Sequence, residues 1–164
     1  MSPVIDVIIE CPSWQQLATV EHIAETAIRA ALAETAVKLR TQAEISVLFC
    51  DDATIRELNK TWRGKDAATN VLSFPAPGPV RLRPMLGDIA IAFGTTQAEA
   101  HAEGKTLAAH VTHLVVHGFL HLLGHDHEVE AQAEAMEAME SRVMTRLGLP
   151  DPFAGSAPVE ARPA

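Results

Sequence analysis

The sequence lacks the usual features of secreted and membrane proteins. It contains only two cysteines, Cys11 and Cys50, which lie far apart. Two such thiols are too few for a disulfide framework or a cysteine-based metal site, so we expect both to be buried and free. The first residues contain no basic segment followed by an apolar run, and no stretch approaches the roughly 18 uncharged apolar residues of a membrane span. These absences favour a cytoplasmic protein with no membrane partner.

Length and composition fit one globular domain. The 164 residues are 48% hydrophobic and 21% charged, which is ordinary for a soluble domain with a substantial core. After Pro150 the chain consists mainly of Pro, Ala, Gly and Glu, with Phe153 as its one aromatic residue. Such a composition predicts a disordered tail over residues 151–164. The remaining 1–150 are expected to form a single metal-dependent hydrolase domain, for the reasons given below.

The net charge of -8 argues at first against a polyanionic partner, but the charges are unevenly distributed. A basic segment lies between positions 56 and 83, and it contains Arg56, Lys60, Arg63, Lys65, Arg81 and Arg83. Residues 126–140 are instead strongly acidic. This asymmetry fits one basic working face and one solvated acidic helix, although a chance distribution of surface charge is the simpler alternative.

Residue patterns predict a small α+β fold. Runs of β-branched and apolar residues predict strands at 4–9, 45–49, 71–74 and 88–92. Apolar residues at helical spacing predict helices over 13–28, 51–63, from 96 onward, over 106–123 and over 128–147. Ser13 and Asp51 are the expected caps of the first two helices. Because strands and helices mix without strict alternation, we expect a small mixed four-stranded sheet packed with about five helices.

The most informative segment is rich in histidine and spans residues 113–127. His117 and His121 lie four residues apart on a predicted helix, so their side chains project from one face. Gly124 can adopt a positive φ and end this helix, which would turn the chain so that His127 reaches the same ion. Metzincin proteases place zinc ligands and a glycine at the same four relative positions, so we predict a zincin-like metal helix.

Three imidazole ligands would leave a fourth tetrahedral position for a zinc-bound water, the arrangement of a catalytic site. One Zn²⁺ per chain is therefore the predicted cofactor, and the zinc-bound water is a predicted catalytic group. His125 competes with His127 as a ligand but breaks the template spacing. His113, one turn before His117, is a candidate for a supporting role at the site, with a packing or hydrogen-bonding role as the alternative. Asp88 and Asp126 are candidates for orienting the ligand imidazoles, or else serve as turn or cap residues.

Gly118 separates this site from a zinc peptidase. The proteases carry their general-base glutamate directly after the first histidine, where this chain has Gly118. Without that carboxylate, ordinary peptidase chemistry lacks its group for proton transfer, so the peptidase alternative is disfavoured. A glycine here is also expected to leave room for a nucleotide beside the metal.

The block His117-Gly118-Phe119-Leu120-His121-Leu122-Leu123-Gly124-His125-Asp126-His127 resembles the H-G-x-L-H-L-x-G-x-D-H signature of the YbeY family, which are bacterial endoribonucleases also called rRNA maturation factors. Two further blocks agree, Leu58-Asn59 through Ser73-Phe74-Pro75 and Leu86-Gly87-Asp88-Ile89. The resemblance covers roughly residues 40–148. One departure is Asn70, because the family commonly has aspartate there; we assign Asn70 no catalytic role.

The resemblance implies zinc-dependent cleavage of single-stranded RNA, 3′-end maturation of small-subunit rRNA, and ribosome quality control. Its implied partners are RNA, the small ribosomal subunit and assembly factors, with no DNA. The essential arginine of the family corresponds to Arg63, and a permanent cation can hold a phosphate and stabilise charge on phosphorus. The other predicted RNA contacts are Lys60, Lys65, Arg81 and Arg83. A ribosome-assembly factor with a structural zinc is the non-enzymatic alternative.

Overall fold

The computed structural model describes residues 3–126 and 128–154, and its centre is a four-stranded sheet. The strands are β1 (Val4–Ile9), β2 (Glu44–Cys50), β3 (Val71–Pro75) and β4 (Met85–Ala92). Their order in the sheet is β1-β2-β4-β3, with β1, β2 and β4 parallel and β3 antiparallel to β4 at one edge. The predicted α+β class with a mixed four-stranded sheet is therefore confirmed.

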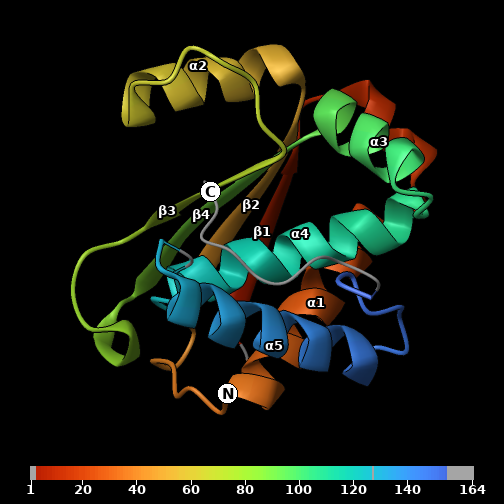
Figure 1. The fold of residues 1–164 in the computed structure, drawn as a ribbon. Coiled ribbons are helices and arrows are strands. Elements are labelled where there is room, and N and C mark those ends of the chain that lie inside the picture. Colours follow the sequence, from red (N-terminus) through yellow and green to blue (C-terminus); the bar gives the residue numbers. More distant parts are fainter. Residues whose placement is uncertain (1–2, 127, 155–164) are drawn as a thin grey trace.

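Helices cover both faces of this sheet. The α-helices of the described residues are α1 (Val20–Thr35), α2 (Asp52–Arg63), α3 (Phe93–Ala102), α4 (Leu107–Leu122) and α5 (Glu130–Arg146). Two short 3₁₀ helices, η1 (Pro12–Gln16) and η2 (Val80–Leu82), lie in the connections. Figure 1 shows α1, α4 and α5 on one side of the sheet and α2 on the other. The helix α4 lies directly against β3 and β4.

The alternation of side chains along each strand produces two cores. The larger core lies between the sheet and helices α1, α4 and α5, and Val47, Ile89 and Phe119 are fully buried in it. The smaller core lies under α2 and contains Cys50 and Ile55. Both cysteines are buried and free, as the sequence predicts.

Local capping residues define the helices on either side of the site. The side chain of Asp51 accepts a hydrogen bond from Thr54 N at 2.8 Å and caps α2, as predicted. Gly64, at φ +70°, ends the same helix immediately after Arg63. Thr106 caps α4 by accepting from Ala109 N at 3.1 Å. These contacts satisfy backbone donors that a helix leaves unpaired at its first turn.

The predicted start of the first helix, at Ser13, is wrong. Instead of one helix from Ser13, the chain forms η1 and then a separate α1 from Val20. Trp14 is responsible, because its indole N–H donates to Cys50 O at 2.9 Å at the end of β2. The Trp14 ring also packs edge-on against Phe49 and Phe93. These long-range contacts hold η1 against the sheet and override the local helical signal.

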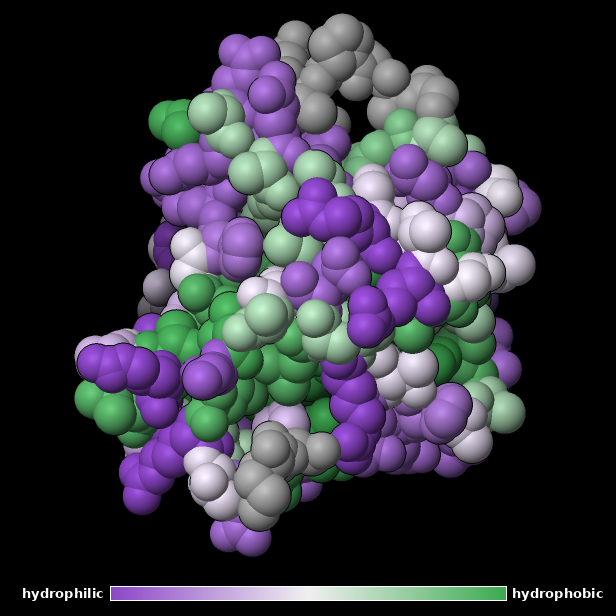
Figure 2. All heavy atoms as spheres, turned by 90° about the horizontal axis from the view of Figure 1, so that it is seen from below, coloured by the Kyte–Doolittle hydropathy of each residue, from purple (hydrophilic) through white to green (hydrophobic). Residues whose placement is uncertain are grey.

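The surface of the molecule mixes polar and apolar residues. On the face seen from below in Figure 2, hydrophobic residues gather in a patch bordered by hydrophilic ones. Within the part of the chain that the structure describes, no helix is both long and apolar enough to cross a membrane.

Candidate metal centre and its surroundings

A row of four histidines runs along one face of α4. His110, His113, His117 and His121 follow the i, i+3, i+4 spacing that places side chains on one face of a helix. The centroids of successive rings are 6.4, 6.3 and 4.7 Å apart. From Val111 to Leu122 the other residues of α4 are buried, so the sheet and α1 hold this row in place.

The closest pair in the row is the predicted ligand pair. The Nε2 atoms of His117 and His121 are 3.2 Å apart. Two nitrogens bound to one tetrahedral zinc at about 2.0–2.1 Å each would be about 3.3–3.4 Å apart. The two imidazoles are therefore already spaced to share one zinc ion.

The third predicted ligand, His127, lies outside the described residues. Within residues 3–126 and 128–154, no group of three potential ligands is close enough to hold a metal ion. The competing candidate His125 follows the end of α4, where its backbone N–H donates to Leu120 O at 3.0 Å. The described residues thus supply two converging imidazoles, and the full ligand set stays a prediction.

A buried carboxylate that sequence analysis missed supports this pair. Glu140 of α5 is 1% exposed, and its Oε1 accepts from His117 Nδ1 at 2.5 Å. Its Oε2 lies 3.3 Å from His113 Nε2. Burial alone would raise the pKa of Glu140, but hydrogen bonds and charge interactions with both histidines outweigh it and hold the pKa at about 2. A carboxylate with so low a pKa stays ionised near neutral pH.

The signal for Glu140 was present in the sequence. The apolar stripe of α5 includes Ala133, Met136 and Val143, all buried. Glu140 falls four residues after Met136 and three before Val143, so it lies within this stripe. The prediction of a solvated acidic helix is therefore wrong for Glu140, which is buried. A single charged residue inside an apolar stripe is instead the pattern of a buried, paired group.

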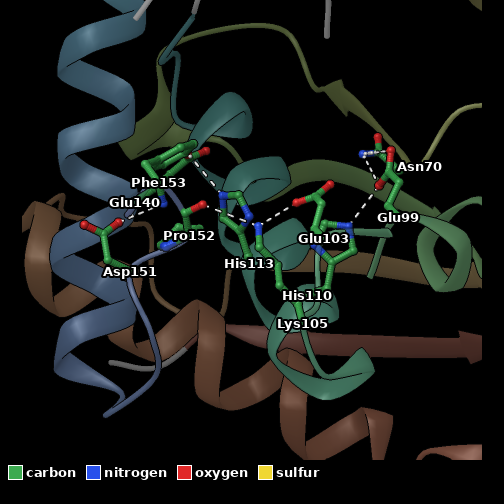
Figure 3. Close-up of polar contacts among 10 residues, drawn as sticks. All are labelled: Asn70, Glu99, Glu103, Lys105, His110, His113, Glu140, Asp151, Pro152 and Phe153. Atoms are coloured by element: carbon green, nitrogen blue, oxygen red, sulfur yellow. Dashed lines mark hydrogen bonds and ion pairs between the residues drawn. The ribbon is translucent and has the colours of Figure 1, made fainter. Parts of the chain in front are cut away.

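The segment that follows α5 packs against one side of the histidine row. The Phe153 ring lies edge-on to His113, with ring centroids 5.4 Å apart. Ser141 Oγ donates to Asp151 Oδ1 at 2.8 Å, and Lys105 Nζ lies 3.4 Å from Pro152 O. Figure 3 shows this segment and Glu140 on one side of His113. Residues 151–154 thus dock beside α4, although the predicted tail began at 151; residues 155–164 lie outside the described part.

A second carboxylate pairs with the far end of the row. Glu99 Oε1 lies 2.9 Å from His110 Nε2 and also accepts from Asn70 Nδ2 at 2.9 Å. Asn70 Oδ1 in turn accepts from Val71 N. Figure 3 shows this cluster beyond His110, away from Glu140. The role of Asn70 visible here is to donate to Glu99 and fix the start of β3, which an aspartate could not do in the same way.

Gly118 faces the sheet, which corrects the expectation that it makes room for a nucleotide. A Cβ placed on Gly118 would lie 2.9 Å from Ile89 Cγ2 and 3.1 Å from Ser73 Oγ. Ser73 Oγ donates to Gly118 O at 2.9 Å. The glycine is therefore required by the close packing of α4 on β3 and β4. A glutamate at this position would be forced into the core, so this backbone does not suit the general base of a zinc peptidase.

Arg63 lies at the outer edge of β3. Its Nη2 donates to Ser73 O at 2.6 Å, and its guanidinium carbon is 5.6 Å from the centroid of the Phe74 ring. Because Ser73 Oγ bonds to Gly118 O, this one serine connects Arg63 to the helix that carries the histidines. Arg63 and Lys65 also line a pocket of about 240 Å³ with Asn59 and Thr69. A guanidinium has five N–H donors, so an anchored Arg63 retains donors for a phosphate.

The other predicted RNA contacts divide into two groups. Lys60, Lys65 and Arg81 are exposed. Arg83 is bound to the protein itself, because its Nε donates to Gly78 O at 2.8 Å and its Nη1 to Leu122 O at 2.9 Å. Leu122 ends α4, where unpaired carbonyls favour a cation. The structure therefore assigns Arg83 to securing the loop before β4.

The two aspartates that were candidates for orienting the imidazoles lie in different parts of the structure. Asp88 pairs across the sheet with Ser46 and Phe74, and with them lines a groove of about 520 Å³ on the face under α2. Its side chain thus lies on the opposite face of the sheet from α4, away from His117. Asp126 is half-buried in the turn after α4, next to position 127.

Comparisons with known proteins identify the fold first. The solution structure of TM1509 from Thermotoga maritima shares the fold, with a TM-score of 0.56 and 23% sequence identity, over 88% of this chain and 92% of that one. The molecule thus belongs to a known fold class, a mixed four-stranded sheet covered by helices.

The family is shown by closer relatives. The family model described as endoribonuclease YbeY matches residues 9–148. A protein from Methylocella silvestris named endoribonuclease YbeY is 51% identical over 153 residues, covering 93% of this chain and 87% of its own length. One of the same name from Rhodopseudomonas palustris is 49% identical, covering 93% of this chain and 91% of its own. The chain therefore belongs to the endoribonuclease YbeY family, as the histidine block predicts.

Proposed function

We propose that this protein is a zinc-dependent endoribonuclease that cleaves single-stranded RNA and acts in 3′-end maturation of small-subunit rRNA and in ribosome quality control. The observation that carries the proposal is the 3.2 Å approach of the His117 and His121 Nε2 atoms, in a chain about half identical to proteins named endoribonuclease YbeY. RNA, the small ribosomal subunit and assembly factors are the proposed partners, and the cytoplasm is the proposed location.

His117 and His121 would hold the metal, with His127 as the proposed third ligand. When bound, zinc would supply Lewis-acid stabilisation of charge on a phosphoryl group and would activate water at neutral pH. The chain's contribution is to present two imidazoles from one rigid, buried helix. Because α4 is packed on both sides, little reorganisation is needed on binding, and that favours affinity.

Arg63 is the residue proposed to contact the scissile phosphate. Its Nη2 is anchored on Ser73 O and its plane lies near the Phe74 ring, so the guanidinium is held in one place. A fixed planar fork binds phosphate oxygens through two parallel hydrogen bonds and stabilises negative charge that develops on them. The exposed Lys60, Lys65 and Arg81 would attract the RNA backbone through longer-range electrostatics.

The activity is tested by incubating purified protein with a single-stranded RNA and, separately, with casein, each with and without a chelator. We expect RNA cleavage that the chelator abolishes and zinc restores, and no proteolysis. Chelator-sensitive casein cleavage without RNA cleavage would overturn the assignment. Stoichiometric zinc with neither activity, in the presence and absence of small ribosomal subunits, would favour the non-catalytic assembly factor.

The site residues are tested by substitution. His117→Ala, His121→Ala and His127→Ala should each remove most of the bound zinc, whereas His125→Ala should retain it. Elemental analysis showing the reverse for His125 and His127 would correct the ligand set. Arg63→Ala should cut RNA cleavage at least tenfold at unchanged zinc content. Arg63→Lys should restore it only in part, because lysine lacks the planar fork.

A further inference from the structure

The carboxylate of Glu140 is not part of the histidine motif, yet it contacts two members of the histidine row. Its two oxygens are divided between His117 Nδ1 at 2.5 Å and His113 Nε2 at 3.3 Å. Glu140 comes from α5, 23 residues after His117 in the sequence. The packing of α5 on α1 and α4 brings it to this position.

We propose that Glu140 is a positioning residue for the metal site, holding the His117 ring by its Nδ1 so that its Nε2 faces the metal. The contact between Glu140 Oε1 and His117 Nδ1 is a hydrogen bond in which the ring nitrogen donates, so Nε2 is the ring nitrogen that can bind a metal. The lone pair is then on Nε2, the atom that lies 3.2 Å from His121 Nε2. This inference rests on the proposed function, because it assumes that the two histidines hold a metal.

The burial of Glu140 supports a role beyond stability. Its neighbours in the α5 stripe, Met136 and Val143, are apolar and fully buried. A well-packed apolar residue in place of a buried ionic group is often neutral or stabilising, because the charge loses its hydration on folding. A charge retained in such a stripe is therefore poorly explained by stability alone. Orientation of an imidazole is a task that an apolar side chain cannot perform.

The surroundings of His113 give Glu140 a second fixed contact. His113 Nδ1 is buried without a hydrogen-bond partner in the described structure, so this ring donates through Nε2 only. The Phe153 ring packs edge-on against His113 and holds it in place. Figure 3 shows Glu140 and Phe153 beside His113. His113 thus restrains the carboxylate, and the carboxylate orients His117.

The test compares Glu140→Gln with Glu134→Gln, a matched change at an exposed position of the same helix. Zinc affinity is measured by competition with a chromophoric chelator, and thermal unfolding is measured on metal-free protein. Loss of a carboxylate partner to a metal-bound histidine weakens metal binding by about 10–100-fold. We expect Glu140→Gln to show this loss and a changed visible spectrum of the cobalt-substituted protein, while Glu134→Gln matches the wild type.

Two results separate positioning from a purely structural role. If Glu140→Gln lowers the melting temperature of the metal-free protein but leaves zinc affinity and the cobalt spectrum unchanged, the inference is overturned. Glu140→Asp keeps the charge on a shorter arm and should recover part of the affinity. If the wild type itself binds no zinc, the proposed function fails, and this inference fails with it.

A measurement on the wild type tests the inference without using any variant of Glu140. Two-bond ¹H–¹⁵N correlation spectra of the metal-free protein report which ring nitrogen of each histidine carries the proton. His117, assigned by loss of its signals in His117→Ala, should show the Nδ1–H form near neutral pH. The Nε2–H form at His117 would contradict the proposal directly.

Discussion

Replacing Gly118 with alanine tests the contact that seats the metal helix on the sheet. The added Cβ would lie 2.9 Å from Ile89 Cγ2 and 3.1 Å from Ser73 Oγ. Carbon atoms in contact are normally about 3.5–4.0 Å apart, so α4 must move away from β4 by roughly half an ångström or more. Both neighbours are buried in the sheet, which limits their ability to give way.

The expected change in the free energy of unfolding follows from two opposing effects. Adding a methyl group to a well-packed core costs about 1–3 kcal/mol. Replacing glycine with alanine inside a helix gains about 1 kcal/mol. The steric cost of the added methyl group should exceed the gain in helix propensity, so Gly118→Ala should lower the free energy of unfolding by about 1 kcal/mol. Urea unfolding of zinc-stripped protein measures this without a contribution from the metal.

Removing the obstructing methyl provides the control. Ile89→Ala deletes Cγ2 and is itself destabilising, but Gly118→Ala added to that background should be less costly than in the wild type, or even stabilising. The double-mutant cycle then gives a coupling energy between the two positions. If Gly118→Ala alone raised stability by about 1 kcal/mol, as at an unobstructed helical glycine, the close-packing argument would be refuted.

Two further predictions concern a buried thiol and a loop arginine. Burial, with the nearby Asp51 and Glu10 charges, raises the pKa of Cys50 from 9.0 to about 12, so the native thiol stays neutral where the unfolded one ionises. The contribution of this thiol to the free energy of unfolding is complete below pH 9 and should decline by about 1.4 kcal/mol per pH unit between 9 and 12. Cys50→Ala should remove this decline when unfolding is measured as a function of pH. If the decline persisted in Cys50→Ala, it would not come from Cys50. Arg83→Ala should lower stability by about 1–2 kcal/mol while leaving the salt dependence of RNA binding unchanged, whereas exposed Arg81→Ala should leave the melting temperature unchanged. If the RNA affinity of Arg83→Ala depended less on salt concentration than that of the wild type, Arg83 would be an RNA contact after all.

The features that sequence alone determined are those set by neighbours along the chain. His117 and His121 share a face because any helix places residues four apart together. The cap at Asp51 depends on a side chain and a backbone N–H three residues later. Strand composition gave the four strands, and the spaced histidine block gave the family. None of these requires knowledge of how the elements pack.

Tertiary structure decided which side chains serve the site. Trp14 ends a predicted helical segment through a bond to Cys50, 36 residues away. The register of β4 places Asp88 under α2, whereas the packing of α5 carries Glu140 to His117. Arg83 is bound to the end of α4, across 39 residues of sequence. Periodicity assigns a side chain to one face of its own element, but only the packing of elements determines what that face meets.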